Sequence, residues 1–404
     1  MKSISRIRFL DRTTAPHIST LILLAGMSAL AMNIFLPSLP GMADYFGVEY
    51  AFMQLSVALY LAVNGVLQIF VGPISDKYGR RPVILWGTAL FCLATLGCLL
   101  STSGTMFLVF RMLQAVIAVA IVLSRAVVRD MFPQEKAASV MGYVTMGMSL
   151  VPMVGPALGG YLETLFSWKA SFVLLLICGT ALFTLAWFDL GETAQKSDRS
   201  ITQQFREYPE LLTSPRFWGY CLAAALNAGA FFAYLGGGPF VGTEVFHLPP
   251  EKVGLYFAMP GLGYFLGNFI SGRFSAHIGV NRMIQRGTMV TSSGLVLALL
   301  LSLTGLHHPL LFYGSMVFVG IGNGMTIPNA SSGMLSVRSH LAGTASGLGG
   351  TIMIGGGAAL SALAGAMLVP GSTEIPLIGL MASTSMASIL CISFIIRRER
   401  VTNI

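Results

Sequence analysis

The sequence has very few charged residues. Only 10% of its 404 residues are Asp, Glu, Lys or Arg, whereas 54% are apolar and the mean hydropathy is +0.75. A soluble globular domain carries about 25% charged residues, so this composition excludes that class. Continuous apolar runs, each long enough to cross a hydrocarbon core of ~30 Å as a helix, recur along the chain and exclude an outer-membrane barrel. The sequence therefore predicts an all-α membrane protein with many spans.

Residues for metal, disulfide or nucleotide chemistry are also scarce. The five cysteines fall inside apolar runs without a C-x-x-C spacing, which indicates neither disulfides nor a metal site. None of the six lysines follows a glycine, so the chain has no Walker A phosphate loop. No catalytic triad or metal-ligand group falls within the apolar runs. We therefore expect no cofactor and no enzyme activity.

The basic residues are distributed unevenly between the predicted loops. Of 24 Lys and Arg, 21 fall on one side, Lys169 and Lys252 on the other, and Arg111 within a span. The positive-inside rule then places both termini in the cytoplasm and requires an even number of spans. The net charge of +8 is thus explained by the bilayer, without a nucleic-acid partner. The first apolar run is too long for a signal-peptide core, so we interpret it as an uncleaved helix.

Twelve spans are predicted, in two groups of six joined by one polar linker. The expected domains are residues 1–190, the cytoplasmic linker 191–216, and residues 217–404. The predicted spans lie near 18–41, 51–73, 83–101, 105–128, 137–161, 169–189, 217–240, 251–273, 283–304, 310–333, 343–368 and 376–396.

The stretch from Gly72 to Pro82 is a charged turn between two apolar runs. It carries Asp76, Lys77, Arg80 and Arg81, which we expect to lie in water. Asp76 can accept hydrogen bonds from helix-terminal N–H groups or pair with an arginine. Its two glycines, Gly72 and Gly79, recur 200 residues later as Gly272 and Gly279, which is weak evidence for two related halves.

Two predicted spans contain further unusual residues. In the fifth span, small and helix-bending residues occupy three turns, which favours close approach of a neighbouring helix. These residues are Pro152, Gly155, Pro156, Gly159 and Gly160. In the fourth span, Arg111 lies about six residues inside an apolar run, at a cost of ~3 kcal/mol on insertion scales. We expect its side chain to face a watery cavity and to have a partner.

These motifs resemble those of the major facilitator superfamily. The turn matches G-x-x-x-D-[RK]-x-G-R-[RK] at every position, the fifth span resembles the G-P-x-x-G-G antiporter signature, and Arg111 to Gln114 resembles R-x-x-Q-G. Together they resemble the drug:proton antiporter family with twelve spans, in its branch of bicyclomycin and chloramphenicol resistance exporters. Strings that match this branch are residues 31–37, 125–130, 192–193, 328–330 and 342–346.

The resemblance implies two pseudo-symmetric six-helix bundles that alternately open a central cavity to either face. The residues to which it assigns coupling or gating are Asp76, Arg80, Arg81, Arg111, Asp130, Pro152, Gly155, Pro156, Gly159 and Gly160.

One residue departs from the branch pattern. The branch has an acidic residue where this chain has Asn33, and the amide cannot titrate. None of the 16 acids lies deep inside a predicted span. Three alternatives stay open: a peripheral group such as Asp130 or Asp44 couples transport to protons, transport proceeds without obligatory coupling, or Arg111 is a fixed counter-charge for an anionic or electron-rich substrate.

Polar and aromatic residues within the predicted spans form the candidate binding wall, because amides in lipid need partners. For each aromatic residue, plain helix packing is the competing interpretation. The set is Asn33, Gln54, Tyr60, Asn64, Gln68, Arg111 and Gln114 in the first half, and Asn227, Phe231, Phe232, Tyr234, Tyr256, Tyr264, Asn268 and Asn323 in the second.

The sequence thus predicts a monomeric, multi-pass transporter of the bacterial inner membrane. Its partners would be lipid, a small drug-like substrate, largely apolar and typically an antibiotic, and protons. The main alternative is an exporter or facilitator of a metabolite, such as a sugar or amino-acid derivative, without obligatory proton coupling. A membrane sensor or enzyme on the same scaffold is a third reading.

Overall fold

The computed structural model describes residues 8–402, apart from residues 133, 195–207 and 339–341. All regular secondary structure in these described ranges is helical, which confirms the all-α prediction. Eleven of the described helical segments are long and apolar enough to cross a membrane. One further long helix, α7, contains residues whose side chains lie outside the description. With it, six long segments lie on each side of the linker.

The N-terminal bundle is built from eight helices and two short 3-10 turns, several of which join end to end. Prolines 37 and 40 divide the first predicted span, because proline removes a helical hydrogen bond. The elements are α1 (Ile18–Asn33), η1 (Leu36–Ser38), α2 (Leu39–Phe46), α3 (Tyr50–Tyr78), α4 (Arg80–Leu99), α5 (Gly104–Gln114), η2 (Ala115–Ile117), α6 (Ala118–Met131), α7 (Gln134–Leu165) and α8 (Trp168–Asp189).

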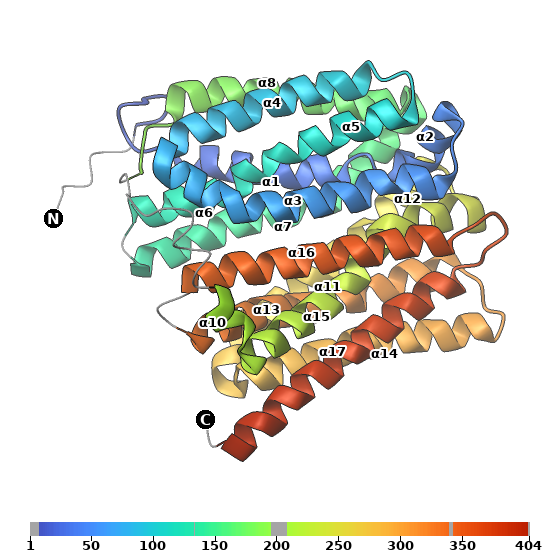
Figure 1. Ribbon diagram of the computed structural model, residues 1–404. Coiled ribbons are helices and arrows are strands. Elements are labelled where there is room, and N and C mark those ends of the chain that lie inside the picture. Colours follow the sequence, from blue (N-terminus) through green and yellow to red (C-terminus); the bar gives the residue numbers. More distant parts are fainter. Residues whose placement is uncertain (1–7, 133, 195–207, 339–341, 403–404) are drawn as a thin grey trace.

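The C-terminal bundle follows a short helix after the linker. Its elements are α10 (Tyr208–Leu212), α11 (Pro215–Phe240), η3 (Val241–Val245), α12 (Pro250–Tyr256), α13 (Ala258–Ile278), α14 (Val280–Leu303), α15 (Pro309–Val337), α16 (Ala342–Met367) and α17 (Ile375–Thr402). Figure 1 shows the two bundles side by side, with the long helices running between two opposite ends of the molecule.

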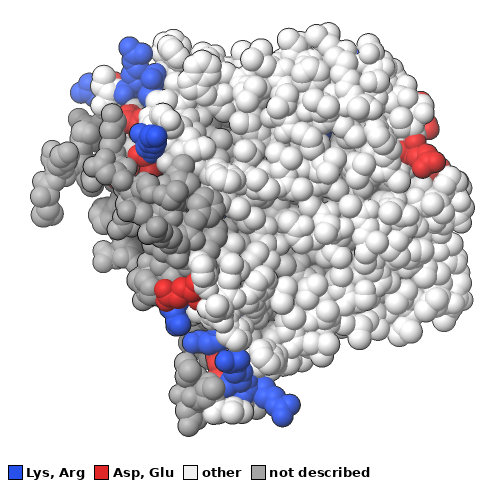
Figure 2. All heavy atoms as spheres, viewed as in Figure 1, with Lys and Arg blue, Asp and Glu red and all other residues white. Residues whose placement is uncertain are grey.

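The two ends of the molecule differ in charge. The first described residues and the end of α17 lie at one end, which also carries most of the visible Lys and Arg and is here called the basic end (Figures 1 and 2). The opposite, far end shows a few acidic side chains, and the broad band between the ends is uncharged on this face (Figure 2). An uncharged band between two charged rims is the surface that a bilayer requires.

The predicted turn from Gly72 to Pro82 is much tighter than expected. Helix α3 continues to Tyr78 and α4 begins at Arg80, so Gly79 alone joins them. Gly79 has φ 100° and ψ 153°, a conformation that only glycine adopts readily. Gly279 joins α13 to α14 with φ 88° and ψ 150°. The 200-residue repeat predicted from the glycines therefore corresponds to two helix–helix joints with similar backbone angles.

The two bundles touch mainly toward the far end. Tyr50 donates a hydrogen bond of 2.7 Å to the carbonyl oxygen of Gly236, and Gln54 Nε2 lies 2.6 Å from the carbonyl oxygen of Ser361. Nearer the middle, Thr351 donates to the carbonyl oxygen of Gly65 at 3.1 Å. Toward the basic end, a Cβ added at Gly72 or Gly347 would meet no atom within 4 Å. Among the described residues, the halves are therefore closed at the far end and less closely packed at the basic end.

The N-terminal segment is fastened to the end of α8. Asp189 is fully buried, and its carboxylate accepts hydrogen bonds from the Leu10 N–H at 2.7 Å, the His17 N–H at 3.0 Å and the Thr20 hydroxyl at 2.6 Å. Three donors to one carboxylate satisfy a charge that burial would otherwise make costly. The contact holds α1 against the last helix of its own bundle.

Candidate functional site

Arg111 is a fully enclosed cation of the N-terminal bundle, with no exposed surface. It lies in the last turn of α5, where α5 gives way to η2. Its guanidinium donates to the carbonyl oxygens of Ala31 on α1, at 2.9 Å, and Ser56 on α3, at 3.4 Å. It also donates to the side-chain carbonyl of Gln114, whose amide nitrogen is 2.8 Å from the Thr95 hydroxyl. Arg111 therefore connects three helices.

Two aromatic rings complete this enclosure. The guanidinium carbon lies 4.2 Å from the ring centroid of Phe35 and 4.0 Å from that of Tyr60. Stacking on ring faces suits a planar, weakly hydrated cation. No described carboxylate lies within ion-pair distance of Arg111. The prediction that Arg111 faces a watery cavity is therefore wrong for this conformation, because carbonyls and rings take the place of water.

Asn33 occupies the end of α1, at the position where the motif resemblance leads us to expect an acid. It is buried, and its amide nitrogen donates to the carbonyl oxygen of Ala29 at 2.7 Å, while its side-chain oxygen has no partner among the described residues. Asn33 is directed toward α7: a Cβ added at Gly155 would lie 3.9 Å from the Asn33 Cβ. The residue of the candidate site that lies next to α7 is therefore neutral.

The glycines of α7 form a seam that only small residues allow. A Cβ at Gly159 would collide with the carbonyl oxygen of Ile34, within the N-terminal bundle, and a Cβ at Gly160 with that of Pro250, in the other half. Reciprocally, a Cβ at Gly254 of α12 would collide with the carbonyl oxygen of Pro156. Pro152 and Pro156 lie inside α7 itself. The predicted glycine seam is thus where the two halves meet at the far end.

The other predicted wall residues fall into separate groups. In the N-terminal half, Asn64 accepts a hydrogen bond from Gln68 at 2.8 Å. In the C-terminal half, Asn227 donates to Asn323 at 2.9 Å, and both are buried. Each pair lies within one bundle, where a hydrogen bond between the amides offsets part of the cost of burying them. The structure therefore does not gather the predicted wall into one site.

Four of the five predicted aromatics of the C-terminal half, all except Tyr264, belong to one cluster near the far end. Tyr234 is fully buried, with its ring 4.6 Å from that of Phe257, and Tyr256 stacks on Tyr313 at 4.7 Å and an interplanar angle of 9°. Phe231 lies beside Tyr234, with ring centroids 6.5 Å apart. This is the geometry of close packing between α11, α12 and α15.

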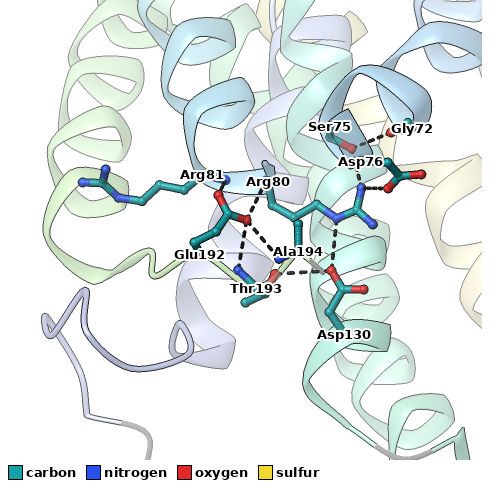
Figure 3. Close-up of polar contacts among 9 residues, drawn as sticks. All are labelled: Gly72, Ser75, Asp76, Arg80, Arg81, Asp130, Glu192, Thr193 and Ala194. Carbon is teal, nitrogen blue, oxygen red and sulfur yellow. Dashed lines mark hydrogen bonds and ion pairs between the residues drawn. The ribbon is translucent and has the colours of Figure 1, made fainter. Parts of the chain in front are cut away.

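Charged residues at the basic end of the N-terminal bundle form a connected network (Figure 3). Arg80 binds Asp76 at 2.5 Å and Asp130, on α6, at 3.0 Å, and it also donates to the Ser75 hydroxyl. Arg80 is only 8% exposed, so the expectation that it lies in water is wrong: its charge is instead neutralised by two carboxylates. Arg81 points away from this group and donates to the carbonyl oxygen of Trp187 at 3.1 Å (Figure 3).

Glu192 is a member of this network that the sequence did not assign to the site. Its carboxylate accepts from the backbone N–H of Arg80 at 2.8 Å and of Arg81 at 3.2 Å, so it caps the start of α4 (Figure 3). Of the two roles predicted for Asp76, the structure shows the pairing with an arginine, Arg80, while Glu192 caps the helix. Thr193 donates to Asp130 at 3.3 Å and joins the cap to the ion pairs. The only indication of this role in the sequence was the match of residues 192–193 to the branch pattern.

Arg125 lies inside α6, one turn before Arg129. The predicted span 105–128 contains this position. Its side chain is exposed to solvent, in contrast to the buried residues on either side. The candidate site of the N-terminal bundle therefore contains one shielded cation, Arg111, and one accessible cation.

The fold and these motifs identify the family. The chain matches the model of the Major Facilitator Superfamily over residues 21–362 and belongs to that family. It is 31% identical to the MFS-type transporter YdgK of Bacillus subtilis over 94% of each chain. It is also 27% identical to the bicyclomycin resistance protein homolog of Haemophilus influenzae, over 96% of this chain and 98% of that protein.

Two further comparisons extend this result. The chain is 30% identical to the chloramphenicol resistance protein of Pseudomonas aeruginosa, over 81% of this chain and 79% of that protein. Among solved structures, it resembles a peptide transporter POT in complex with alafosfalin, with a TM-score of 0.76 over 98% of this chain and 99% of that one. At 12% identity this likeness concerns the fold alone. The protein is thus a multi-pass membrane protein with the major facilitator fold.

Proposed function

We propose that the protein exports small, largely apolar compounds, including antibiotics, from the cytoplasm by alternating access. The glycine seam between α7 and α12 carries this proposal, because it allows the two halves to pack backbone to backbone at the far end. Relatives that align with most of the chain are named for resistance to bicyclomycin and chloramphenicol, which supports drugs as the cargo.

The proposed cycle moves two bodies, residues 1–190 and 217–404, joined by the linker 191–216. The basic end faces the cytoplasm of a bacterial cell in this proposal, as the positive-inside rule predicts, so closure at the far end makes the described state accessible from the cytoplasm. In this cycle, the Asp76–Arg80–Asp130 network gates the basic end, and the glycine seam gates the far end. We expect the monomer to be the transporting unit.

Proton antiport is the proposed driving reaction, although Asn33 cannot carry the proton. Asp130 and Asp44 remain candidates, and Glu163 near the end of α7 is a third, because its Oε2 atom is buried without a partner among the described residues. The Asn33 amide favours the second candidate function, a metabolite exporter or facilitator that needs no proton.

Two measurements test this function. Expression in a bacterial host without its own exporters should raise the inhibitory concentration of chloramphenicol or bicyclomycin, while Gly160→Leu, produced at an equal membrane level, should not. Uptake of a labelled drug into everted vesicles, with and without an imposed pH gradient, separates antiport from facilitation. Equal growth of cells with and without the protein across a broad drug panel would reject the exporter and leave the metabolite transporter.

A further inference from the structure

The basic end of the C-terminal bundle contains a pocket that the proposed transport cycle does not use. It has a volume of about 410 Å³, it is open to the surface, and residues of α11, α14, α15 and α17 line it. Ile278 and Gly279, at the joint between α13 and α14, form part of its wall. Figure 2 shows basic side chains at this end of the molecule, where α17 finishes. The volume falls in the range of small-ligand sites, roughly 300–1,000 Å³.

Contacts among α11, α14 and α17 hold the polar side of this pocket in place. Arg216 on α11 forms an ion pair with Glu399 on α17 at 2.9 Å. The Tyr220 hydroxyl lies 2.7 Å from the side-chain oxygen of Asn281 and 3.2 Å from the Glu399 carboxylate, to which the Asn281 amide also donates. A Cβ added at Gly333 would lie 2.7 Å from the Tyr220 ring, so the absence of a side chain there lets α15 approach this ring. The polar groups are therefore positioned before a ligand arrives.

The same region of the N-terminal bundle is occupied by ion pairs. There, the Asp76–Arg80–Asp130 network lies beside the glycine that joins α3 to α4. At the joint of α13 and α14, the positions 200 residues after Asp76 and Arg80 are Ala276 and Val280. Short side chains without charge thus replace an acid and an arginine at the second joint, although the backbone angles of the two joints are similar. The space beside the second joint is left for a ligand.

The charges that line the pocket favour an anion. Two arginines, Arg216 and Arg282, face one carboxylate, Glu399, which already accepts from three side chains. The Arg216 Nε atom has no hydrogen-bond partner among the described residues, and Arg282 forms no ion pair with a described carboxylate. Ser332 on α15 contributes a hydroxyl to the wall. Guanidinium and hydroxyl donors from separate helices suit the oxygens of a phosphate group.

We propose that this pocket binds a phosphate-bearing anion, with Arg216, Arg282 and Ser332 as donors from α11, α14 and α15. The proposal goes beyond drug export and does not depend on it. A ligand held by three helices stabilises the folded C-terminal bundle, because it binds the folded protein and not the unfolded chain.

Two sources present this chemistry at the basic end: the headgroup of an anionic phospholipid and a soluble phosphate compound. Ile278 gives the pocket an apolar edge, and Phe274, one turn earlier on the same face of α13, is 46% exposed. These side chains continue the pocket toward the uncharged band of the molecule, where an acyl chain can lie. We therefore expect the phospholipid to bind more tightly than free phosphate.

Three ligands provide the test on the purified full-length protein in an uncharged detergent. Dissociation constants are measured for dihexanoyl phosphatidylglycerol, for dihexanoyl phosphatidylcholine and for inorganic phosphate. We expect phosphatidylglycerol to bind one saturable site at least about tenfold more tightly than phosphatidylcholine, whose choline group cancels the phosphate charge. Phosphate binding weaker than that of phosphatidylglycerol identifies a lipid as the ligand, whereas equal or tighter binding identifies a soluble compound.

Arg282→Gln is the first variant, because Arg282 is exposed and its replacement breaks no described ion pair. We expect it to weaken phosphatidylglycerol binding about fivefold. Arg286→Gln removes the same charge one turn along α14, outside the pocket lining, and is the matched control that should leave the affinity unchanged. Ser332→Phe fills the pocket without a change of charge and should abolish binding.

Equal affinity for the two lipids, without binding of phosphate, would overturn the inference, since the site would then not select a charge. Equal weakening by Arg282→Gln and Arg286→Gln would also overturn it, because the whole basic rim would be responsible. Full binding by Ser332→Phe, or no saturable binding of any of the three ligands to the native protein, rejects the pocket. Thermal unfolding of each variant identifies misfolding. If Ser332→Phe is unstable, Ser332→Asp places an acid at the same position and should abolish anion binding.

Discussion

At the scale of single residues, Arg111 shows how a membrane protein can hold a charge without a counter-ion. Two backbone carbonyls, one amide oxygen and two ring faces surround the guanidinium. The planar fork of arginine matches this arrangement, whereas the ammonium group of lysine is a compact point charge. Arg111 therefore carries a charge and also holds α1, α3 and α5 together.

Replacing Arg111 by Lys or Ala should abolish export. Lysine keeps the charge but cannot donate to the Ala31 and Ser56 carbonyls together, so we expect efflux to fall at least about tenfold in both variants. Drug uptake into everted vesicles at matched protein levels measures this. Full activity of Arg111→Lys would show that charge alone is required, and Arg129→Gln is the control for a general loss of basic charge.

Replacing Asn33 by Asp introduces the acid that the motif resemblance leads us to expect at this position. The new carboxylate loses the 2.7 Å donation to Ala29 and lies beside Gly155, in a buried position where it gains a proton easily. We expect export by Asn33→Asp to depend more steeply on an imposed pH gradient than export by the native chain. The pH-gradient dependence of vesicle uptake is the measurement. An unchanged dependence would indicate that another carboxylate already carries the proton.

Sequence reasoning identified Arg111 but not its surroundings. An arginine in an apolar run is visible in the sequence, whereas the carbonyls that bind it lie 80 and 55 residues away and have no side-chain signature. Residue type was thus predictable and enclosure was not.

At the scale of elements, α7 depends on having no side chain at two adjacent positions. Gly159→Ala would collide within its own bundle, so we expect lower thermal stability by about 1–3 kcal/mol. Gly160→Ala would collide across the halves and should shift the protein away from far-end closure with a smaller loss of stability. Cross-linking between engineered cysteines at Leu158 and Leu255, both exposed near the seam, reports closure. Gly72→Ala is the matched control, because a Cβ there meets nothing within 4 Å.

The cap of α4 makes a separate prediction. Glu192→Ala leaves the N–H groups of Arg80 and Arg81 without their acceptor, at a cost of about 1 kcal/mol. Glu192→Gln keeps an acceptor oxygen and should recover part of this loss. Thermal unfolding of the purified variants measures the difference, and equal stability of all three proteins would contradict the capping role.

The turn motif illustrates what an element-level pattern can and cannot predict. The glycines correctly placed a helix–helix joint at both Gly79 and Gly279, because their backbone angles exclude other residues. The same pattern predicted solvated charges, but the helices continue beyond the apolar runs and bury Arg80 between Asp76 and Asp130. Hydropathy reports where lipid ends and gives no information on where a helix ends.

At the scale of the whole molecule, the two ends should face different compartments. We expect a cysteine introduced at Tyr78 or Val401, both highly exposed at the basic end, to react with a membrane-impermeant thiol reagent only from the cytoplasmic side. A cysteine at Tyr45, exposed at the far end, should react only from outside. The five native cysteines are replaced first. Reaction of Tyr78 and Val401 positions from opposite sides would contradict an even number of spans.

The twelve-span architecture was the most predictable property of the chain. Long apolar runs, the uneven placement of Lys and Arg and one polar linker suffice for helix number and grouping, because the bilayer permits few alternatives. The arrangement of the halves was not predictable in the same way. It depends on backbone contacts such as Gly160 against Pro250, which are 90 positions apart and carry no pattern in the sequence.

The buried carboxylate of Asp189 also affects how the protein folds while it is being synthesised. Its partner Thr20 leaves the ribosome 169 residues earlier, an interval of about 8 to 34 s at bacterial elongation rates. During that time the first helix is in the membrane while the anchor for its leading segment does not yet exist. Completion of the N-terminal bundle therefore waits for α8, its sixth long span. An arrest of translation before Asp189 would leave a nascent chain whose N-terminal segment is accessible to proteases.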